Sequence, residues 1–154
     1  MFDIILFQPE IPPNTGNIVR LCANTASRLH LIEPIGFHMD DRTLRRAGLD
    51  YREFADIRRY RGWNDWVAAH PGKRVLAFTT KGRQRYDLFR FEPGDALLFG
   101  PETRGLPAEI LSLFPPEQQL RLPMVTQDRS LNLANTVAIA VYEAWRQAGF
   151  RGGN

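Results

Sequence analysis

The chain of 154 residues has one cysteine, Cys22, and therefore cannot form an internal disulfide. That composition favours a reducing, intracellular setting. No apolar run approaches the ~20 residues that a membrane helix needs. The amino terminus also lacks the charged-then-apolar layout of a signal peptide. The sequence therefore predicts a cytoplasmic protein without a membrane segment.

The common catalytic and nucleotide-binding signatures are also missing. The three histidines are scattered, with no cysteine or acid at ligand spacing, so we expect no metal site. There is no glycine-rich dinucleotide fingerprint, no Walker phosphate loop and no nucleophile turn around a serine. Any chemistry must come from less distinctive polar loops.

Apolar residues make up 44% of the chain and charged residues 24%, as in a globular protein. We find no internal repeat, low-complexity tract or long linker, so residues 1–154 are expected to form one domain. Strand and helix patterns alternate, which predicts the α/β class with a mainly parallel sheet flanked by helices. Expected strands cover residues 1–7, 29–32, 57–60, 74–78, 96–99 and 119–122. Expected helices cover residues 18–26, 40–46, 63–69, 108–114 and 131–147, the first capped by Asn14 or Thr15 after a loop over residues 8–17.

Positive charge is concentrated in one segment. The net charge is +3 and the isoelectric point is about 9.4, but residues 42–61 hold seven arginines against three acids. Arginine suits phosphate binding, and the interleaved Tyr51, Tyr60 and Trp63 suit stacking on unpaired bases. The alternative is a solvated helix face with core aromatics.

Three polar loops follow expected parallel strands and should share one edge of the sheet. They begin at Thr79, at Gly100 and at Pro123, and the last ends near Ser130. With apolar side chains beside them, they suit a nucleoside-like ligand. Glu102 and Arg104 on the middle loop have a plainer interpretation, an ordinary turn carrying a surface ion pair.

Two helical segments carry further expectations. The helix start between Asn14 and Arg20 suits an anion such as a phosphate, although a plain capped turn and a solvated arginine fit the same residues. The last helix is apolar nearly all round. It is either buried inside the domain or packed half on its own sheet and half on a partner; we favour the partner and hence a homodimer.

These segments resemble, in order, the three motifs of the SPOUT RNA methyltransferases, and the chain looks like a TrmH-type ribose 2′-O-methyltransferase. The matching stretches are residues 14–20, 98–106, and 122–124 with 130–135. Two more stretches, residues 9–17 and 45–51, are similar to the subgroup that methylates wobble nucleotide 34 of tRNA, a cytidine or modified uridine. The likeness runs along essentially the whole chain.

The resemblance implies a deep trefoil knot in the carboxyl-terminal part, a homodimer with the last helix in its interface, and S-adenosylmethionine as cofactor, without a metal. By position it implies cofactor contacts from Phe78, Thr79, Gly100, Glu102, Gly105, Leu122, Met124, Ser130 and Leu131. We expect Gly100 and Gly105 to be glycines because the backbone approaches the ligand there.

The resemblance also makes Arg20 the main catalytic candidate, with Ser130 and Asn132 ordering the knot loop and the substrate ribose. We favour an electrostatic role for Arg20, since losing its proton is costly. The expected contacts to the tRNA anticodon stem-loop come from Asn14, Asn17, Arg20, Arg45 and Arg46. Methylation of ribosomal RNA and a non-catalytic RNA-binding protein of this fold are the alternatives. Arg104 is open between a substrate phosphate and a partner subunit, and residues 125–129 have no assigned role.

Overall fold

The computed structural model describes residues 1–39, 42, 57–126 and 129–154. The expected basic helix up to Arg46, with Arg45 and Tyr51, lies outside these residues. Among the helices of the described part, none is long and apolar enough to cross a membrane.

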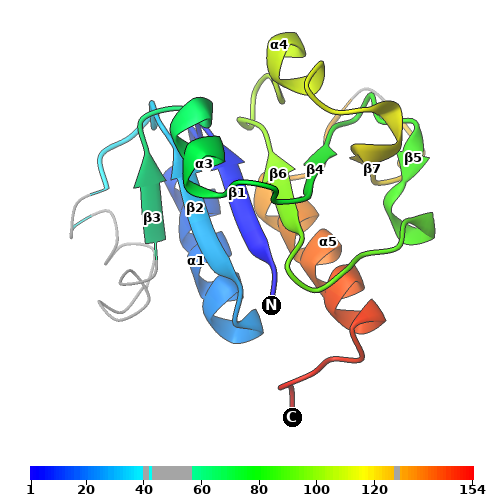
Figure 1. Ribbon diagram of the computed structural model, residues 1–154. Helices are drawn as coiled ribbons and strands as arrows, with labels where there is room; N and C mark the ends of the chain where they lie inside the picture. The colour runs from blue at the N-terminus through cyan, green and yellow to red at the C-terminus, as the bar shows by residue number, and fades with distance from the viewer. Residues whose placement is uncertain (40–41, 43–56, 127–128) are drawn as a thin grey trace.

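A seven-stranded sheet forms the centre of the molecule, in the order β3-β2-β1-β6-β4-β7-β5 (Figure 1). The pairings between neighbouring strands are all parallel, which confirms the expected class. The strands are β1 (Asp3–Phe7), β2 (Arg28–Ile32), β3 (Ile57–Tyr60), β4 (Val75–Phe78), β5 (Gln84–Arg85), β6 (Ala96–Phe99) and β7 (Gln119–Arg121). The short β5 at the edge was not expected from the sequence.

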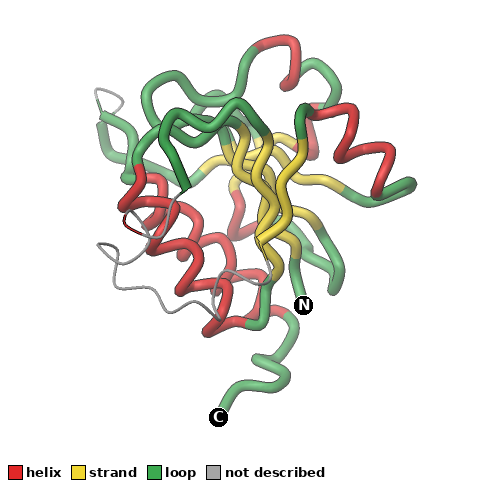
Figure 2. Tube along the Cα trace, turned by 90° about the vertical axis from the view of Figure 1, so that its left-hand side faces the viewer, coloured by secondary structure: helices red, strands yellow, loops and turns green. Residues whose placement is uncertain are grey.

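Helices cover both faces of the sheet, giving three layers (Figures 1 and 2). On one face, alternate residues of β1 and β6 pack against α1 (Pro12–Thr25) and α5 (Leu133–Gln147). On the other, the intervening residues pack against α3 (Trp63–Ala69) and α4 (Ala108–Leu111). Burial on both faces explains the unbroken apolar sequence of β1 and β6. Two single-turn 3-10 helices are present in the described residues, η2 (Tyr86–Leu88) and η3 (Pro116–Gln118).

Helix α1 begins six residues earlier than expected, so the predicted loop up to Asn17 and the predicted cap are both wrong. Pro12 and Pro13 occupy its first turn, and Ile11 is the N-cap residue without a side-chain cap. Proline lacks an N–H and has a preset φ, so it fits the first turn of a helix. Asn14 and Thr15 are therefore buried inside the helix.

Helix α5 begins at Leu133, after an Asn132 cap whose Oδ1 accepts a hydrogen bond from the Asn135 amide at 3.2 Å. Its buried residues face the sheet and α1, while Ile139 and Tyr142 remain 39% and 46% exposed. The residues that the structure describes thus leave an apolar strip of this helix uncovered, formed by Ile139 and Tyr142.

Two other predictions concern the carboxyl-terminal half. Helix α4 ends at Leu111, three residues before the predicted end, and single turns follow it to Phe114. The trefoil knot stays a prediction, because the loop that would close it includes residues 127–128, which lie outside the described residues.

Candidate active site

A cavity of about 470 Å³ lies at the carboxyl edge of the sheet, where the loops after β4, β6 and β7 meet the start of α5. Its size is within the range of small-molecule sites. All nine side chains and backbones expected around a cofactor line it: Phe78, Thr79, Gly100, Glu102, Gly105, Leu122, Met124, Ser130 and Leu131. Asn14 and Asn132 line it as well.

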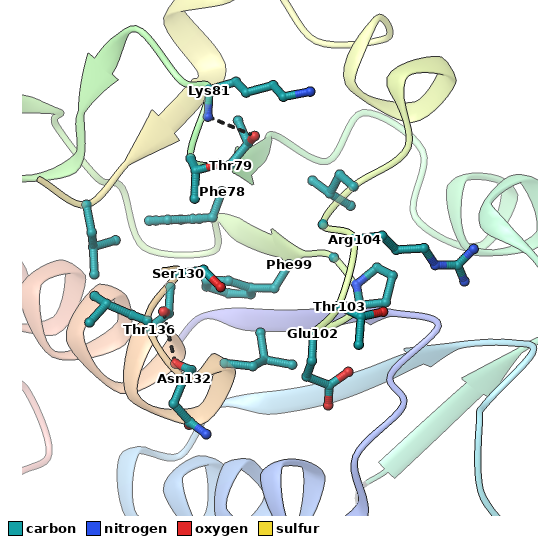
Figure 3. A pocket seen from close by; sticks show the side chains of 18 of the residues that line it. Phe78, Thr79, Lys81, Phe99, Glu102, Thr103, Arg104, Ser130, Asn132 and Thr136 are labelled. Atoms are coloured by element: carbon teal, nitrogen blue, oxygen red, sulfur yellow. Dashed lines mark hydrogen bonds between the residues drawn. The ribbon is translucent and has the colours of Figure 1, made fainter. Parts of the chain in front are cut away.

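Two stacked aromatic rings mark one wall of the cavity (Figure 3). Phe78 ends β4 and Phe99 ends β6, where they are register partners. Their ring centroids are 4.7 Å apart and their planes differ by 18°. Together with Leu122 and Met124 they provide apolar surface for a flat, aromatic ligand.

The loop after β4 is held by its own backbone and by Thr79. The Thr79 amide donates to the Leu120 carbonyl at 2.9 Å, and the Gly82 amide donates to the Thr79 carbonyl at 3.1 Å. The Thr79 hydroxyl accepts from the Lys81 amide at 3.2 Å. A Cβ on Gly82 would lie 2.7 Å from the Gln119 carbonyl oxygen, so only glycine fits there.

Gly100 is required for a different reason from the one expected. A Cβ at this position would lie 2.2 Å from the backbone nitrogen of Leu106 and 2.3 Å from the carbonyl carbon of Gly105. The chain's own loop, rather than a ligand, makes the close approach. Gly105 has φ of +66°, a left-handed conformation that favours glycine, and its amide donates to the Pro101 carbonyl at 2.9 Å.

Glu102 is bound to the start of α1 and not to Arg104. Its carboxylate accepts hydrogen bonds from the amides of Glu10 and Ile11, at 2.8 and 3.0 Å, and from Asn14 Nδ2 at 3.3 Å. The anion that the start of this helix attracts is therefore one of the chain's own carboxylates. The interpretation as a turn with a Glu102–Arg104 ion pair is wrong; Arg104 donates to Gln8 Oε1 instead, at 3.2 Å.

A reciprocal contact runs from the amino-terminal segment back to the loop. Glu10 Oε1 accepts from the amide and the hydroxyl of Thr103, at 3.2 and 2.8 Å. These hydrogen bonds lower the pKa of the Glu10 carboxyl. We call Glu10, Glu102 and their bonded partners the glutamate clasp. Nothing in the sequence pattern around Glu10 pointed to it.

Asn14 extends this network to the third loop. Its Oδ1 accepts from Asn132 Nδ2 at 2.9 Å, while its Nδ2 donates to Glu102. Asn14 is 5% exposed. Asn132 in turn caps α5. Asn14 thus joins the start of α1 directly to the cap of α5 and also to the loop after β6.

The other predicted site residues differ in their position relative to the cavity. Ser130 is exposed and lines the cavity, as Figure 3 shows. Asn17 and Arg20 are exposed residues of α1 and are not among the cavity lining. Arg20 follows Asn14 by about 9 Å along the helix axis. Arg45 and Arg46 lie outside the described residues, so their role stays a prediction.

Among the residues that the structure describes, no three histidine, cysteine or acidic side chains are grouped as ligands for a metal ion.

The architecture and the cavity define a methyltransferase-type α/β fold, and the chain belongs to the SpoU rRNA methylase family, whose model matches residues 1–142. A Burkholderia ambifaria protein named tRNA (cytidine(34)-2′-O)-methyltransferase is 61% identical over 155 residues, covering 99% of each chain. The resemblance to SPOUT methyltransferases is thereby confirmed.

Solved structures agree in fold over the whole chain. One, described as giving structural insights into the 2-OH methylation of C/U34 on tRNA, has a TM-score of 0.90 and 47% identity, with 98% of both chains covered. An AdoMet-bound rRNA methyltransferase from Sinorhizobium meliloti has a TM-score of 0.80 and 25% identity, covering 94% of this chain and 56% of that one.

Proposed function

We propose that this protein transfers a methyl group from S-adenosylmethionine to the ribose 2′-hydroxyl of nucleotide 34 in the anticodon loop of tRNA. The observation that carries the proposal is the cavity in which three sequence-distant loops meet. The 61% identity, over 99% of the chain, to a tRNA (cytidine(34)-2′-O)-methyltransferase supports the substrate.

The cavity fits the cofactor in its chemistry. Its stacked phenylalanine rings and its apolar Leu122 and Met124 would hold the adenine ring, and the loop amides and Thr79 would hold the polar groups. When bound, S-adenosylmethionine would supply an electrophilic methyl group to the ribose oxygen, leaving the neutral thioether S-adenosylhomocysteine, while the hydroxyl proton passes to water.

The chain's own residues have to orient the ribose and stabilise charge on its oxygen. Orientation alone is worth several kcal/mol in such reactions. Ser130 and Asn132 border the cavity and would position the ribose. Arg20 would bind the neighbouring phosphate and stabilise the developing oxyanion, while remaining protonated. Asn14 would act through Glu102 and Asn132, to which it is bonded.

Further parts of the proposal concern partners and setting. We propose that the protein forms a homodimer through α5 and that residues 1–154 form a single domain. We also propose a cytoplasmic location and a reaction that needs no metal. Asn17, Arg45 and Arg46 would contact the tRNA together with Arg20.

The substrate is tested by incubating the protein with methyl-labelled cofactor and either unmodified tRNA or ribosomal RNA, followed by mass spectrometry of the labelled nucleotide. Label on the ribose of nucleotide 34 is expected. Ribosomal RNA is the alternative substrate, because the family is named for rRNA methylases. Label found only in ribosomal RNA contradicts the proposal. Label in neither RNA would favour a non-catalytic binding protein.

The role of Arg20 is tested separately. Arg20→Ala should abolish methyl transfer while calorimetric binding of the cofactor persists, because Arg20 is outside the cavity lining. Arg90→Ala is the control, since Arg90 is also exposed but lies before the start of β6, at the other edge of the sheet. Unchanged turnover in Arg20→Ala would remove this residue from the mechanism.

A further inference from the structure

Of the residues that the structure describes, three charged side chains line the cavity, namely Lys81, Glu102 and Arg104. Glu102 is committed to the backbone amides at the start of α1 and to Asn14. Glu102 keeps its negative charge, and the two other charges that the described residues place at the cavity are both positive. They come from different loops, Lys81 from the one after β4 and Arg104 from the one after β6.

Arg104 is oriented by a neutral group and has no carboxylate within ion-pair distance among the described residues, although the Glu10 carboxylate interacts with it electrostatically. Its Nη2 donates to the neutral amide oxygen of Gln8, at 3.2 Å. Gln8 is itself fixed, with φ of +49° and its amide donating to the Ile32 carbonyl at 2.9 Å. The neighbouring Thr103 is held by Glu10. A guanidinium positioned in this way loses less conformational freedom when it binds an anion.

Lys81 is the second cation at the cavity. Across the described part of the chain, neither Lys81 nor Arg104 has a carboxylate within ion-pair distance. Both residues are exposed. In Figure 3 their charged ends extend away from the stacked rings of Phe78 and Phe99, so they stand at the rim.

The cofactor does not account for two cations at the rim. S-adenosylmethionine carries a sulfonium, an ammonium and a single carboxylate, and its overall charge is positive. Lys81 and Arg104 outweigh Glu102 among the charged side chains described in the lining, and a positive lining would not attract a positive cofactor. A ribose inside an RNA chain, in contrast, enters with a phosphate on each side.

We propose that Lys81 and Arg104 bind backbone phosphates of the RNA segment around the target ribose, beside the phosphate that Arg20 would hold, and so position that ribose over the cavity. The inference rests on the proposed function and adds the residues that hold the substrate at the reaction site. Arginine suits the phosphate that must be held in one orientation, because its planar guanidinium donates two parallel hydrogen bonds. Lysine acts as a point charge and tolerates small shifts of the other phosphate.

The test measures tRNA binding by the full-length protein at several salt concentrations, with Lys81→Ala, Arg104→Ala and the double variant. Each lost phosphate contact to a single-stranded segment should reduce the slope of log K against log salt by about 0.7. The double variant should lose about 1.4 in that slope. Arg90→Ala, which removes an equally exposed charge at the other edge of the sheet, should leave the slope unchanged.

Two further readouts separate the possible outcomes. Calorimetry should show that the variants bind S-adenosylmethionine as the wild type does, while the KM for tRNA rises. Arg104→Lys should recover most of the slope, because it keeps the charge. Weaker cofactor binding with an unchanged salt slope would make these residues cofactor ligands and overturn the inference. Wild-type protein that methylates no tRNA would instead overturn the proposed function.

Discussion

The two glutamates of the clasp use their oxygens differently. Glu102 accepts backbone hydrogen bonds with both oxygens, Oε2 from Glu10 and Oε1 from Ile11. Glu10 uses Oε1 for both of its bonds to Thr103. A glutamine in place of Glu10 can therefore keep both hydrogen bonds, because its one amide oxygen can accept them. A glutamine in place of Glu102 would instead point its NH₂ group at a backbone N–H, and one hydrogen bond would be lost.

This asymmetry yields a prediction with a built-in control. Glu102→Gln should lower the free energy of unfolding by about 2 kcal/mol, the usual range for hydrogen bonds to a charged group. It should also lower kcat/KM, because the cavity loop is no longer held to α1. Glu10→Gln should behave as wild type in urea unfolding and in methyl transfer. Equal losses in the two variants would contradict the role assigned to Glu102.

Asp3 is a buried carboxylate at the start of β1, far from the cavity edge. Burial by itself raises its pKa, but the hydrogen bonds from His30, Lys73 and Arg28 outweigh burial and hold the pKa well below the ordinary value. Arg28 Nε donates at 2.7 Å and His30 Nε2 lies at 3.2 Å. This site matters for stability and not for the reaction.

The sign of the pH dependence follows from that direction. A carboxyl whose pKa is lower in the folded than in the unfolded chain stabilises fully above about pH 4, and this contribution is lost as the pH falls further. We expect unfolding by urea to become easier as the pH falls from about 4 to about 2, and this slope to flatten in Asp3→Asn. Asp65→Asn, which changes an exposed partner of Arg61, is the control. An unchanged slope in Asp3→Asn would contradict the assignment.

At the scale of elements, Asn132 serves two of them at once. Its Oδ1 caps α5, and its Nδ2 donates to Asn14 on α1. A substitution can separate the cap from the contact to Asn14, because aspartate retains the acceptor oxygen of asparagine and lacks its NH₂ donor.

Asn132→Ala should therefore cost about 1 kcal/mol of stability through the lost cap. Asn132→Asp should keep that stability, since the two residues cap helices about equally, yet it should lose activity together with the Asn14 contact. Thermal unfolding and methyl-transfer rates measure the two effects. Full activity in Asn132→Asp would show that the link to Asn14 is dispensable.

Local patterns in the sequence were enough to predict several elements. The strands β3 and β6 and the helix α3 have the predicted limits, because each is bounded by residues that end regular structure. The sequence predicts too late a start for α1 because prolines favour a loop as well as the first turn of a helix. The lining of the cavity was anticipated from the motifs.

Side-chain partners within the site were not predictable in the same way. The Glu102–Glu10 bond joins residues 92 apart, and the Asn132–Asn14 bond joins residues 118 apart. Such pairs depend on the order of strands in the sheet, which residue patterns do not encode locally. Gly100 is likewise required because the backbone of Gly105 and Leu106 packs against it, leaving no room for a Cβ.

For the whole molecule, the strip of Ile139 and Tyr142 on α5 predicts association. The wild type should sediment as a dimer at micromolar concentration, because a stable interface needs apolar surface of this kind on both partners. Ile139→Arg should shift it toward the monomer. Leu113→Arg is a fair control, because Leu113 is 59% exposed and lies just after α4, on the other face of the sheet. A monomeric wild type would contradict this part of the proposal.

The central place of β1 in the sheet has a consequence for biosynthesis. Asp3 pairs in register with Arg28 on one side but with Ala96 on the other. A ribosome adding about 5–20 residues per second needs roughly 5–20 s to make the intervening chain. During that interval one edge of an apolar strand is unpaired in the nascent polypeptide. This family member should therefore depend on chaperones most strongly before residue 99 has emerged.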